Sequence, residues 1–256
     1  MDERDREELP LSLEQAWGMT SRPHRGPRPG LSVDRIVEAA LGVAGTEGLA
    51  AVSMSRVAAA LGTGTMSLYR YVASKEELIG LMVDAAYGPP PAPPEPAGDW
   101  RSGLSAWAWG MREALRRQPW VAQVTVSGLP LRPHEVAWWE AALTCLASTA
   151  LREQEKGSVI MLINGYTRNA ASVDADIEAA ARASGQAPGD WMASYARTLA
   201  RLADPDRFPA LAAFVAAGVF EREDPPDAEF GFGLGRLLDG IAGLIGDRSA
   251  TAAAQP

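Results

Sequence analysis

Apolar side chains recur along the chain at intervals of three and four residues, which is the spacing of one face of an α-helix. In the first third of the chain this pattern predicts four short helices, over residues 33–47, 54–61, 65–72 and 75–87. Ser32, Ser53 and Ser74 stand directly before three of them, and a serine hydroxyl there accepts a hydrogen bond from a free amide of the first turn. This region should therefore fold as a small helical module.

Beyond residue 98 the same spacing predicts longer helices, and no alternating pattern typical of β-strands competes with it. The predicted helices cover residues 99–117, 133–151, 152–184, 188–203, 206–217 and 226–246. In the second of them we expect four apolar side chains to face inward, namely Val136, Trp139, Leu143 and Leu146. The predicted fold class is all-α.

A proline-rich stretch divides the two helical regions, because successive prolines disfavour helix and favour an extended chain. We therefore predict a flexible N-terminal extension at residues 1–31, a small module at 32–87, a linker at 88–97, a larger helical domain at 98–248 and a tail at 249–256.

Two short predicted helices are joined by Gly62-Thr63-Gly64, and a short helix, a glycine turn and a second short helix make a helix-turn-helix. In the second of these helices the spacing buries Leu68 and Val72. The remaining side chains then face outward: Thr65, Met66, Ser67, Tyr69, Arg70 and Tyr71. Hydroxyl groups donate to phosphate oxygens and an arginine can pair with a guanine edge, so these residue types suit DNA. The alternative is that the two tyrosines only cover the core of the module.

Charge is unevenly distributed along the chain. The formal net charge is -8, which excludes a uniformly basic nucleic-acid coating, yet residues 22–75 carry seven basic and three acidic side chains. Residues 22–30 are basic and rich in proline, so they could either lie in a minor groove as an extended arm or serve as a linker without DNA contacts.

Three segments of the module resemble the N-terminal signature of the tetracycline-repressor (TetR) family. They are Val57-Ala-Ala-Ala-Leu-Gly62, Leu68-Tyr69-Arg70-Tyr71-Val72 and Ser74-Lys75-Glu76-Glu77-Leu78. The resemblance implies that Tyr69 and Lys75 contact phosphates of a double-stranded DNA operator, and that Thr65, Met66 and Ser67 lie nearest the bases. Tyr71 stands where the family usually has histidine. A tyrosine hydroxyl can still donate to a phosphate, so the departure concerns the geometry of this phosphate contact.

By its position on the preceding helix, Arg56 is a further candidate for a contact with the DNA backbone. A solvated charge with no such contact is the alternative.

Eight tryptophans and eight methionines suit either an apolar cavity wall or an ordinary core. The larger domain resembles, more loosely, the sensor domain of the tetracycline-repressor type, which implies a pocket between helices 99–117, 133–151 and 152–184. The side chains expected nearest to it are Trp107, Met111, Trp138, Met161, Asn164 and Tyr166. Since no titratable pair marks a polar ligand, we expect a small-molecule effector that is largely apolar.

The predicted helix 152–184 carries two usable apolar faces, and helix 226–246 contains closely spaced glycines that let another helix approach. We assign to one face of the long helix the stripe Val159, Leu162, Ile163, Tyr166, Ala170, Val173 and Ile177. TetR-family proteins use two C-terminal helices for a four-helix dimer bundle, so the resemblance implies a homodimer. An intramolecular core is the alternative.

Other function classes find little support in the chain. One cysteine and two histidines leave little for a metal centre, and we find neither a Gly-x-Ser-x-Gly motif nor a phosphate-binding loop, so we expect no cofactor and no enzyme. The N-terminus lacks a signal-peptide pattern and no apolar run reaches the roughly 18 residues of a membrane span, so we expect a cytoplasmic protein with no membrane partner.

Together these features predict a homodimeric, ligand-responsive repressor that leaves its operator when a small molecule binds. The alternative is a DNA-binding regulator whose larger domain only dimerises or binds a protein.

Overall fold

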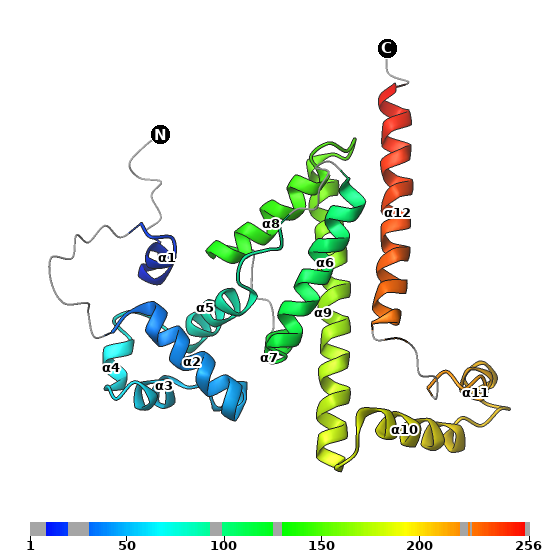
Figure 1. Cartoon of the computed structure of the whole chain (residues 1–256), viewed down its shortest axis with the longest axis horizontal. Coiled ribbons are helices and arrows are strands. Elements are labelled where there is room, and N and C mark those ends of the chain that lie inside the picture. Colours follow the sequence, from blue (N-terminus) through cyan, green and yellow to red (C-terminus); the bar gives the residue numbers. More distant parts are fainter. Residues whose placement is uncertain are drawn as a thin grey trace.

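The computed structural model describes residues 9–19, 31–92, 99–124, 130–220, 225 and 227–253, and these residues fold entirely into helices and connecting turns. The small N-terminal unit contains α1 (Leu11–Ala16), α2 (Val33–Glu47), α3 (Met54–Ala60), α4 (Thr65–Leu68) and α5 (Lys75–Tyr87). The larger unit contains α6 (Trp100–Arg117), α7 (Trp120–Gln123), α8 (Pro133–Leu146), α9 (Glu153–Ser184), α10 (Pro188–Leu202), α11 (Pro209–Ala216) and α12 (Ala228–Ala253). Figure 1 shows α9 and α12 side by side, with α10 and α11 projecting as an arm from the lower end of α9.

The predicted serine caps are confirmed. The hydroxyls of Ser32, Ser53 and Ser74 accept hydrogen bonds from backbone amides three residues further on, at 3.3, 3.2 and 3.1 Å. Each bond satisfies an amide that has no partner within its own helix, so each cap sets where α2, α3 and α5 begin.

Three predicted helix ends are wrong. Helix α4 ends at Leu68 rather than at residue 72, because the amides of Tyr71 and Val72 both bond to the Leu68 carbonyl and turn the chain. Helix α8 ends at Leu146 rather than at residue 151, and the turn that follows brings Leu151 into the core. Helix α12 begins at Ala228 and continues to Ala253, seven residues past the predicted end.

Two predicted inward faces are shifted around their helices. On α8 the buried face is centred on Trp138, Ala142 and Leu146, while Val136, Trp139 and Leu143 are only half-buried. On α9 the predicted stripe is split, because Val159 and Ile163 are buried as expected while Leu162 and Val173 are exposed. Positions outside the stripe are buried as well, namely Ile160, Thr167, Ala171 and Ala175. The core lies on more than one side of these helices, so spacing alone did not locate its centre.

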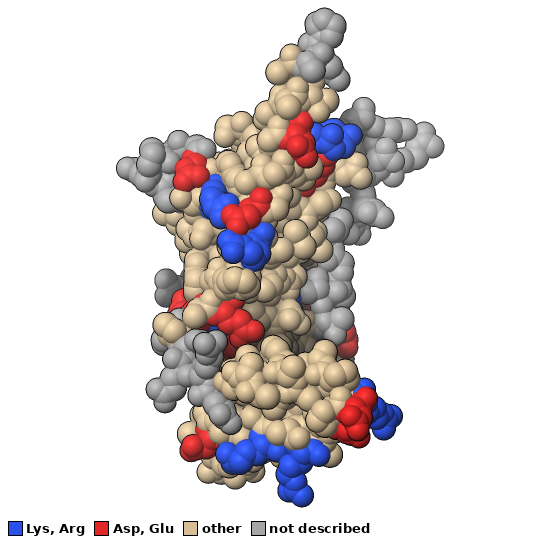
Figure 2. All heavy atoms as spheres, turned by 90° about the vertical axis from the view of Figure 1, so that its right-hand side faces the viewer, with Lys and Arg blue, Asp and Glu red and all other residues tan. Residues whose placement is uncertain are grey.

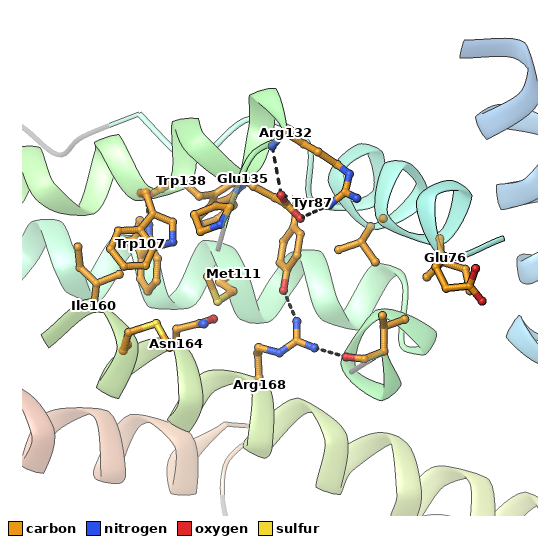
Figure 3. Close-up of a pocket in the computed structure, with 17 residues that line it drawn as sticks. Glu76, Tyr87, Trp107, Met111, Arg132, Glu135, Trp138, Ile160, Asn164 and Arg168 are labelled. Atoms are coloured by element: carbon orange, nitrogen blue, oxygen red, sulfur yellow. Dashed lines mark hydrogen bonds and ion pairs between the residues drawn. The ribbon is translucent and has the colours of Figure 1, made fainter. Parts of the chain in front are cut away.

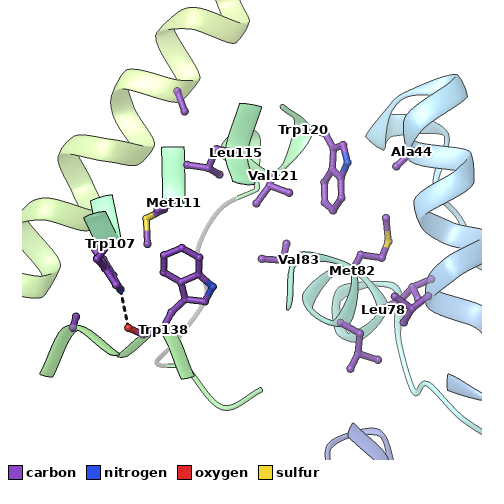
Figure 4. Close-up of a cluster of buried hydrophobic side chains, with 14 of the residues drawn as sticks. Ala44, Leu78, Met82, Val83, Trp107, Met111, Leu115, Trp120, Val121 and Trp138 are labelled. Carbon is purple, nitrogen blue, oxygen red and sulfur yellow. Dashed lines mark hydrogen bonds between the residues drawn. The ribbon is translucent and has the colours of Figure 1, made fainter. Parts of the chain in front are cut away.

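A single hydrophobic core joins the two units. Helix α5 packs against α2 on one side and against α6 and α8 on the other. Figure 4 shows Leu78, Met82 and Val83 of α5 lying between Ala44 of α2 and the Trp120–Val121 region of α7. Helix α5 therefore belongs to both units.

The last turn of α5 is also tied to the larger unit by polar contacts. Asp84 is buried, its Oδ1 accepts a hydrogen bond from the Glu135 amide at 2.9 Å, and its Oδ2 lies 3.1 Å from Nδ1 of His134. The carboxylate thus sits at the N-terminus of α8, where helix amides and the helix dipole favour a negative charge. Just beyond, the carbonyl of Gly88 accepts a bond from Trp138 Nε1 at 2.9 Å.

Part of the predicted N-terminal extension is packed rather than free. Ser12 of α1 is buried and its hydroxyl bonds to the Glu77 carboxylate of α5. Trp17 Nε1 donates to the carbonyl of Leu131 at 2.9 Å, just before α8. The segment therefore bridges both units, whereas the candidate arm at residues 22–30 lies outside the described residues.

The scaffold behind α6 is held by a buried arginine. Arg112 of α6 donates to Asp174 of α9 at 2.7 Å and to Asp227, which precedes α12, at 2.8 Å. Its guanidinium also lies 4.6 Å from the ring centroid of Phe230. Because a buried cation needs such partners, these contacts fix α6, α9 and the start of α12 against one another.

Glu155 makes a second connection between α9 and α12. Its carboxylate accepts hydrogen bonds from the backbone and side chain of Arg152, at 3.0 and 2.7 Å, and from Nε of Arg248 at 2.8 Å. These bonds, with those of Arg152 first in effect, lower the pKa of Glu155 to about 2.

No helix in the described part of the chain is both long enough and apolar enough to cross a membrane.

We expect Asp84→Ala to reduce the free energy of unfolding by about 1–3 kcal/mol, because the Glu135 amide loses its partner inside the protein. Urea titration followed by circular dichroism measures the change. Asp176→Ala, at an exposed position of α9, is the matched control and should be nearly neutral. Equal losses in the two variants would contradict the role assigned to Asp84.

We expect the stability that Glu155 adds to depend on pH. Because its pKa is lower in the folded chain than in the unfolded chain, the advantage of wild type over Glu155→Gln should be complete above about pH 5 and shrink as the pH falls toward 3.5. Melting temperatures of both proteins across this range measure the difference, with Glu178→Gln on the exposed side of α9 as the control. A difference that stays constant with pH would contradict this role.

Candidate functional site

The helix-turn-helix is built from α3, a tight turn and α4. Gly62 has a φ of +65°, a left-handed conformation that glycine adopts without strain, and the Thr63 amide bonds back to the Ala58 carbonyl at 3.0 Å. Leu68 is fully buried and holds α4 against the core. The turn therefore fixes the direction of α4 and leaves its opposite side open to solvent.

The predicted DNA-contacting residues divide by exposure. Met66 is 76% exposed and Tyr69 is 45% exposed, and Arg70 is also exposed. Thr65, Ser67 and Lys75 are half-buried at the starts of α4 and α5. The roles of these six residues in DNA binding stay predictions.

Tyr71 departs from the expectation that it faces outward. Its side chain is half-buried and packs against the hydrophobic core of the module. The ring therefore helps to cover the core, as the alternative reading of the sequence allowed for this tyrosine.

Arg56 is held by a neighbour within the module. Its Nε donates to Glu47 at 3.2 Å, and the second guanidinium nitrogen lies 2.5 Å from the same carboxylate. The hydrogen bond between them raises the pKa of Arg56 and lowers the pKa of Glu47. Contact with a phosphate would require Arg56 to leave or share this carboxylate.

A cavity of about 310 Å³ opens between the two units, and Figure 3 shows how its side chains converge. Helices α5, α6, α8 and α9 and the residues flanking α7 and α8 line it. The lining residues are Glu76, Ile79, Gly80, Val83, Tyr87, Trp107, Met111, Val124, Pro130, Arg132, Glu135, Trp138, Trp139, Ile160, Met161, Asn164 and Arg168.

Five of the six predicted pocket residues lie in this wall, namely Trp107, Met111, Trp138, Met161 and Asn164. The prediction placed Tyr166 there as well, but this side chain packs against α12. Its ring stacks on Phe230 with centroids 5.3 Å apart, and its hydroxyl donates to the Phe230 carbonyl at 3.0 Å. The closely placed Gly233 makes room for it, since a Cβ there would meet the tyrosine ring.

One end of the cavity is aromatic and apolar. The rings of Trp107 and Trp138 meet edge to face with centroids 5.8 Å apart. Trp107 Nε1 donates to the Trp138 carbonyl at 2.8 Å, and Trp138 Nε1 is already bonded to Gly88. With both indole N–H groups occupied, these residues offer the cavity their carbon surfaces.

The other end is polar, where α5 and α9 meet. Arg168 of α9 donates to the Tyr87 hydroxyl at 2.6 Å and to the carbonyls of Val124 and Val121 at 2.9 and 3.2 Å. Burial raises the pKa of Tyr87, and the nearby guanidinium opposes the rise in part. The hydroxyl is therefore neutral near pH 7 and joins the last residue of α5 to the middle of α9.

The expectation that no titratable pair lies in the pocket is wrong. Arg132 and Glu135 form an ion pair at 3.2 Å in the wall, and the Glu135 carboxylate also accepts bonds from the amides of Leu131 and Arg132. The guanidinium of Arg132 lies directly over Gly80 of α5, where a Cβ would collide with it. The pair therefore contacts α5 as well as α8.

Sequence reasoning missed Arg168, Tyr87, Arg132 and Glu135 as pocket residues. A signal existed for Arg168, because it follows Asn164 by four residues and so shares its helix face. None existed for Tyr87 or Gly80, because their place in the wall depends on how α5 docks onto the larger unit.

The chain matches two known families. Residues 36–82 match bacterial regulatory proteins of the tetR family, and residues 92–245 match the tetracyclin repressor-like C-terminal domain. The HTH-type transcriptional repressor DrrR1 of Streptomyces coeruleorubidus is 39% identical over 248 residues, which cover 96% of this chain and 90% of the relative.

Solved structures resemble the chain over most of its length. ActR of Streptomyces coelicolor in complex with actinorhodin has a TM-score of 0.70 at 26% identity, covering 86% of this chain and 99% of ActR. The complex of ActR with (S)-DNPA has a TM-score of 0.67 at 27% identity, covering 84% and 99%.

We expect Glu47→Gln to raise the affinity for a random-sequence DNA duplex by a factor of about three to ten at low salt, because Arg56 is released and one negative charge is removed. Fluorescence anisotropy with a labelled duplex measures the affinity. Glu38→Gln removes the same charge at an exposed position of α2 and should have a smaller effect. Equal gains in both variants would mean that only net charge matters.

Proposed function

Because the chain belongs to the TetR family of bacterial regulatory proteins, we propose that it is a homodimeric repressor that releases its operator when a small molecule fills the cavity. Members of this family are DNA-binding transcriptional regulators, not enzymes. Under this proposal the protein acts in the cytoplasm, where its operator lies.

One observation carries the ligand response: α5 supplies part of the cavity wall. Glu76, Ile79, Gly80, Val83 and Tyr87 all line the cavity, and only six residues separate the end of α4 from the start of α5. A molecule in the cavity therefore contacts the same helix that positions the DNA-reading helix. If it binds one tilt of α5 more tightly than another, it shifts the equilibrium toward that tilt, and the difference in affinity sets the size of the shift. The spacing between the two α4 helices of the dimer changes with it.

The relatives support both parts of the proposal. DrrR1 is a transcriptional repressor by name, and ActR has been solved with actinorhodin and with (S)-DNPA bound. These relatives favour a repressor that responds to a small-molecule effector.

For the DNA contacts we keep the roles assigned from the sequence. The exposed Tyr69 and the helix start at Lys75 contact phosphates, while Thr65, Met66 and Ser67 read bases. Arg70, exposed beside Tyr69, adds positive charge to the same surface. Tyr71 contributes mainly by fixing the end of α4 against the core, and Arg56 contacts phosphate when it exchanges Glu47 for DNA.

We propose that the dimer contact lies on α9 and α12. Leu162 and Phe232 are 51% and 66% exposed there, and a hollow of about 320 Å³ between the helices is lined by Val159, Leu162, Leu237, Ile241 and Leu244, among others. Figure 2 looks onto the side that carries α12 and shows charged side chains in a few clusters separated by broad uncharged areas. Pairing two copies supplies two reading helices for two half-sites, which one helix-turn-helix cannot provide.

The alternative function, a regulator whose larger domain only dimerises or binds a protein, accounts less well for the cavity. A dimer contact needs no hollow that reaches α5, and the Asn164 and Arg168 side chains at its wall have donors that the core does not use.

A DNA-binding assay on the non-coding DNA flanking the chain's own gene tests the proposal, with salt titration and unrelated DNA as competitor. Selective, salt-sensitive binding that Tyr69→Ala abolishes would support it. Absence of selective binding to that DNA and to any sequence selected from a random pool would overturn it.

The same assay separates the assigned roles. We expect Tyr69→Phe to weaken binding to operator and unrelated DNA by similar factors, because the lost hydroxyl contacts phosphate. Ser67→Ala should instead change the preference among operator variants. Equal, sequence-independent losses in both variants would contradict the division between phosphate and base contacts.

A further inference from the structure

We propose that the effector is a flat aromatic molecule with an anionic group, which binds with its rings against the Trp107–Trp138 pair and its negative charge against Arg168. This inference rests on the proposed function, because it takes the cavity as the effector site. It adds the chemical class of the ligand and the contact through which the ligand acts.

The aromatic end of the cavity sets the shape of the ligand body. Trp107, Trp138 and Tyr87 form a connected set of rings, with the Tyr87 and Trp138 centroids 6.1 Å apart. Ile160 and Met111 add apolar surface beside them, as Figure 3 shows. A volume of about 310 Å³ is at the small end of ligand pockets, so the rings of the ligand must be few and flat.

Arg168 sets the charge of the ligand. Among the described residues its hydrogen bonds go only to uncharged oxygens, those of Tyr87, Val121 and Val124. No carboxylate in the described part of the chain lies within ion-pair distance of it, whereas the wall's other arginine, Arg132, is paired with Glu135. A half-buried guanidinium without a counter-charge gains most from an anionic ligand.

Asn164 supports the same assignment independently. It lies one helical turn before Arg168, faces the cavity, and its amide makes no hydrogen bond to any other described residue. An amide N–H beside a guanidinium offers two donors to neighbouring oxygens, an arrangement that suits a carboxylate or an acidic hydroxyl next to a carbonyl.

The two acidic residues of the wall are less available to a cationic ligand than Arg168 is to an anionic one. Glu135 is already bonded to Arg132 and to two backbone amides. Glu76 is exposed at the rim, where water screens its charge.

The same contact explains how the ligand acts on α5. An anion at Arg168 competes with the Tyr87 hydroxyl for the guanidinium, and Tyr87 is the last residue of α5. Binding therefore weakens the link between α9 and the helix that positions α4, and an uncharged ligand of the same shape leaves that link in place.

Three probes with the same rings and different charges test the inference: anthracene-2-carboxylate, anthracene-2-carboxamide and 2-(aminomethyl)anthracene. Isothermal titration calorimetry on the full chain at pH 7 measures their affinities. We expect the carboxylate to bind about tenfold or more tightly than the amide, and the cation to bind most weakly. Equal or tighter binding of the amide or the cation, or no binding of any probe, would overturn the proposal.

Variants of α9 assign the effect to Arg168. Arg168→Gln should bring the affinity for the carboxylate down to that for the amide, and Arg168→Lys, which keeps the charge, should retain part of the difference. Arg182→Gln makes the same substitution at an exposed position near the end of α9 and should leave the difference intact. If the carboxylate keeps its advantage in Arg168→Gln, another group reads the charge and the proposal is wrong.

Operator binding measured on the same samples keeps the two hypotheses apart. Charge discrimination through Arg168 without operator binding would leave the effector chemistry standing and overturn the proposed function. Operator binding without charge discrimination would leave the proposed function standing and overturn the effector chemistry.

Discussion

The buried carboxylate of Asp84 is the constraint on which the arrangement of the two units depends. A buried charge must find partners, and the N-terminal amide of Glu135 and the ring of His134 supply them from α8. The Gly88 carbonyl and the Tyr87 hydroxyl add bonds to Trp138 and Arg168 within the same turn. The end of α5 is thereby tied to the larger unit, through residues that also line the cavity, among them Tyr87, Glu135 and Trp138.

The larger unit has a firmly held side and a side that can respond. Arg112, Asp174 and Asp227 hold α6, α9 and the start of α12 together through an ionic cluster in which the arginine is buried. By contrast, one hydrogen bond, from Arg168 to the Tyr87 hydroxyl, joins α9 to α5 beside the cavity, and the two carbonyls that Arg168 also contacts belong to Val121 and Val124 at α7. A ligand in this cavity, as proposed, would therefore contact α5 where one hydrogen bond in the described part of the chain joins it to α9.

The surface proposed to contact DNA combines residues held in the core with residues left exposed. Leu68 and Val72 hold α4 in the core, and Tyr71 covers that core in part, which leaves Met66, Tyr69 and Arg70 exposed. Arg56 stays bonded to Glu47 in the absence of DNA. The core thus holds α4 in place, and the proposed dimer surface on α9 and α12 carries the exposed apolar residues Leu162 and Phe232.

Local rules were enough to determine much of the chain. Helical spacing located every described α-helix except the short α1 and α7. Serine hydroxyls set the starts of α2, α3 and α5, and two glycines with the residues around them identified the helix-turn-helix, because these features depend only on neighbours along the chain. Five of the six expected pocket residues also lie in one wall, since large aromatic and methionine side chains on three packed helices converge.

Tertiary structure alone decided the rest. The docking of α5 brought Tyr87, Gly80 and Glu76 into the cavity, and the packing of α12 drew Tyr166 away from it onto Phe230. The absence of a described carboxylate partner for Arg168 was likewise beyond the sequence. Burial and charge compensation are set by groups far apart in the chain, and a periodic pattern records only which face of a helix is apolar, not what lies against it.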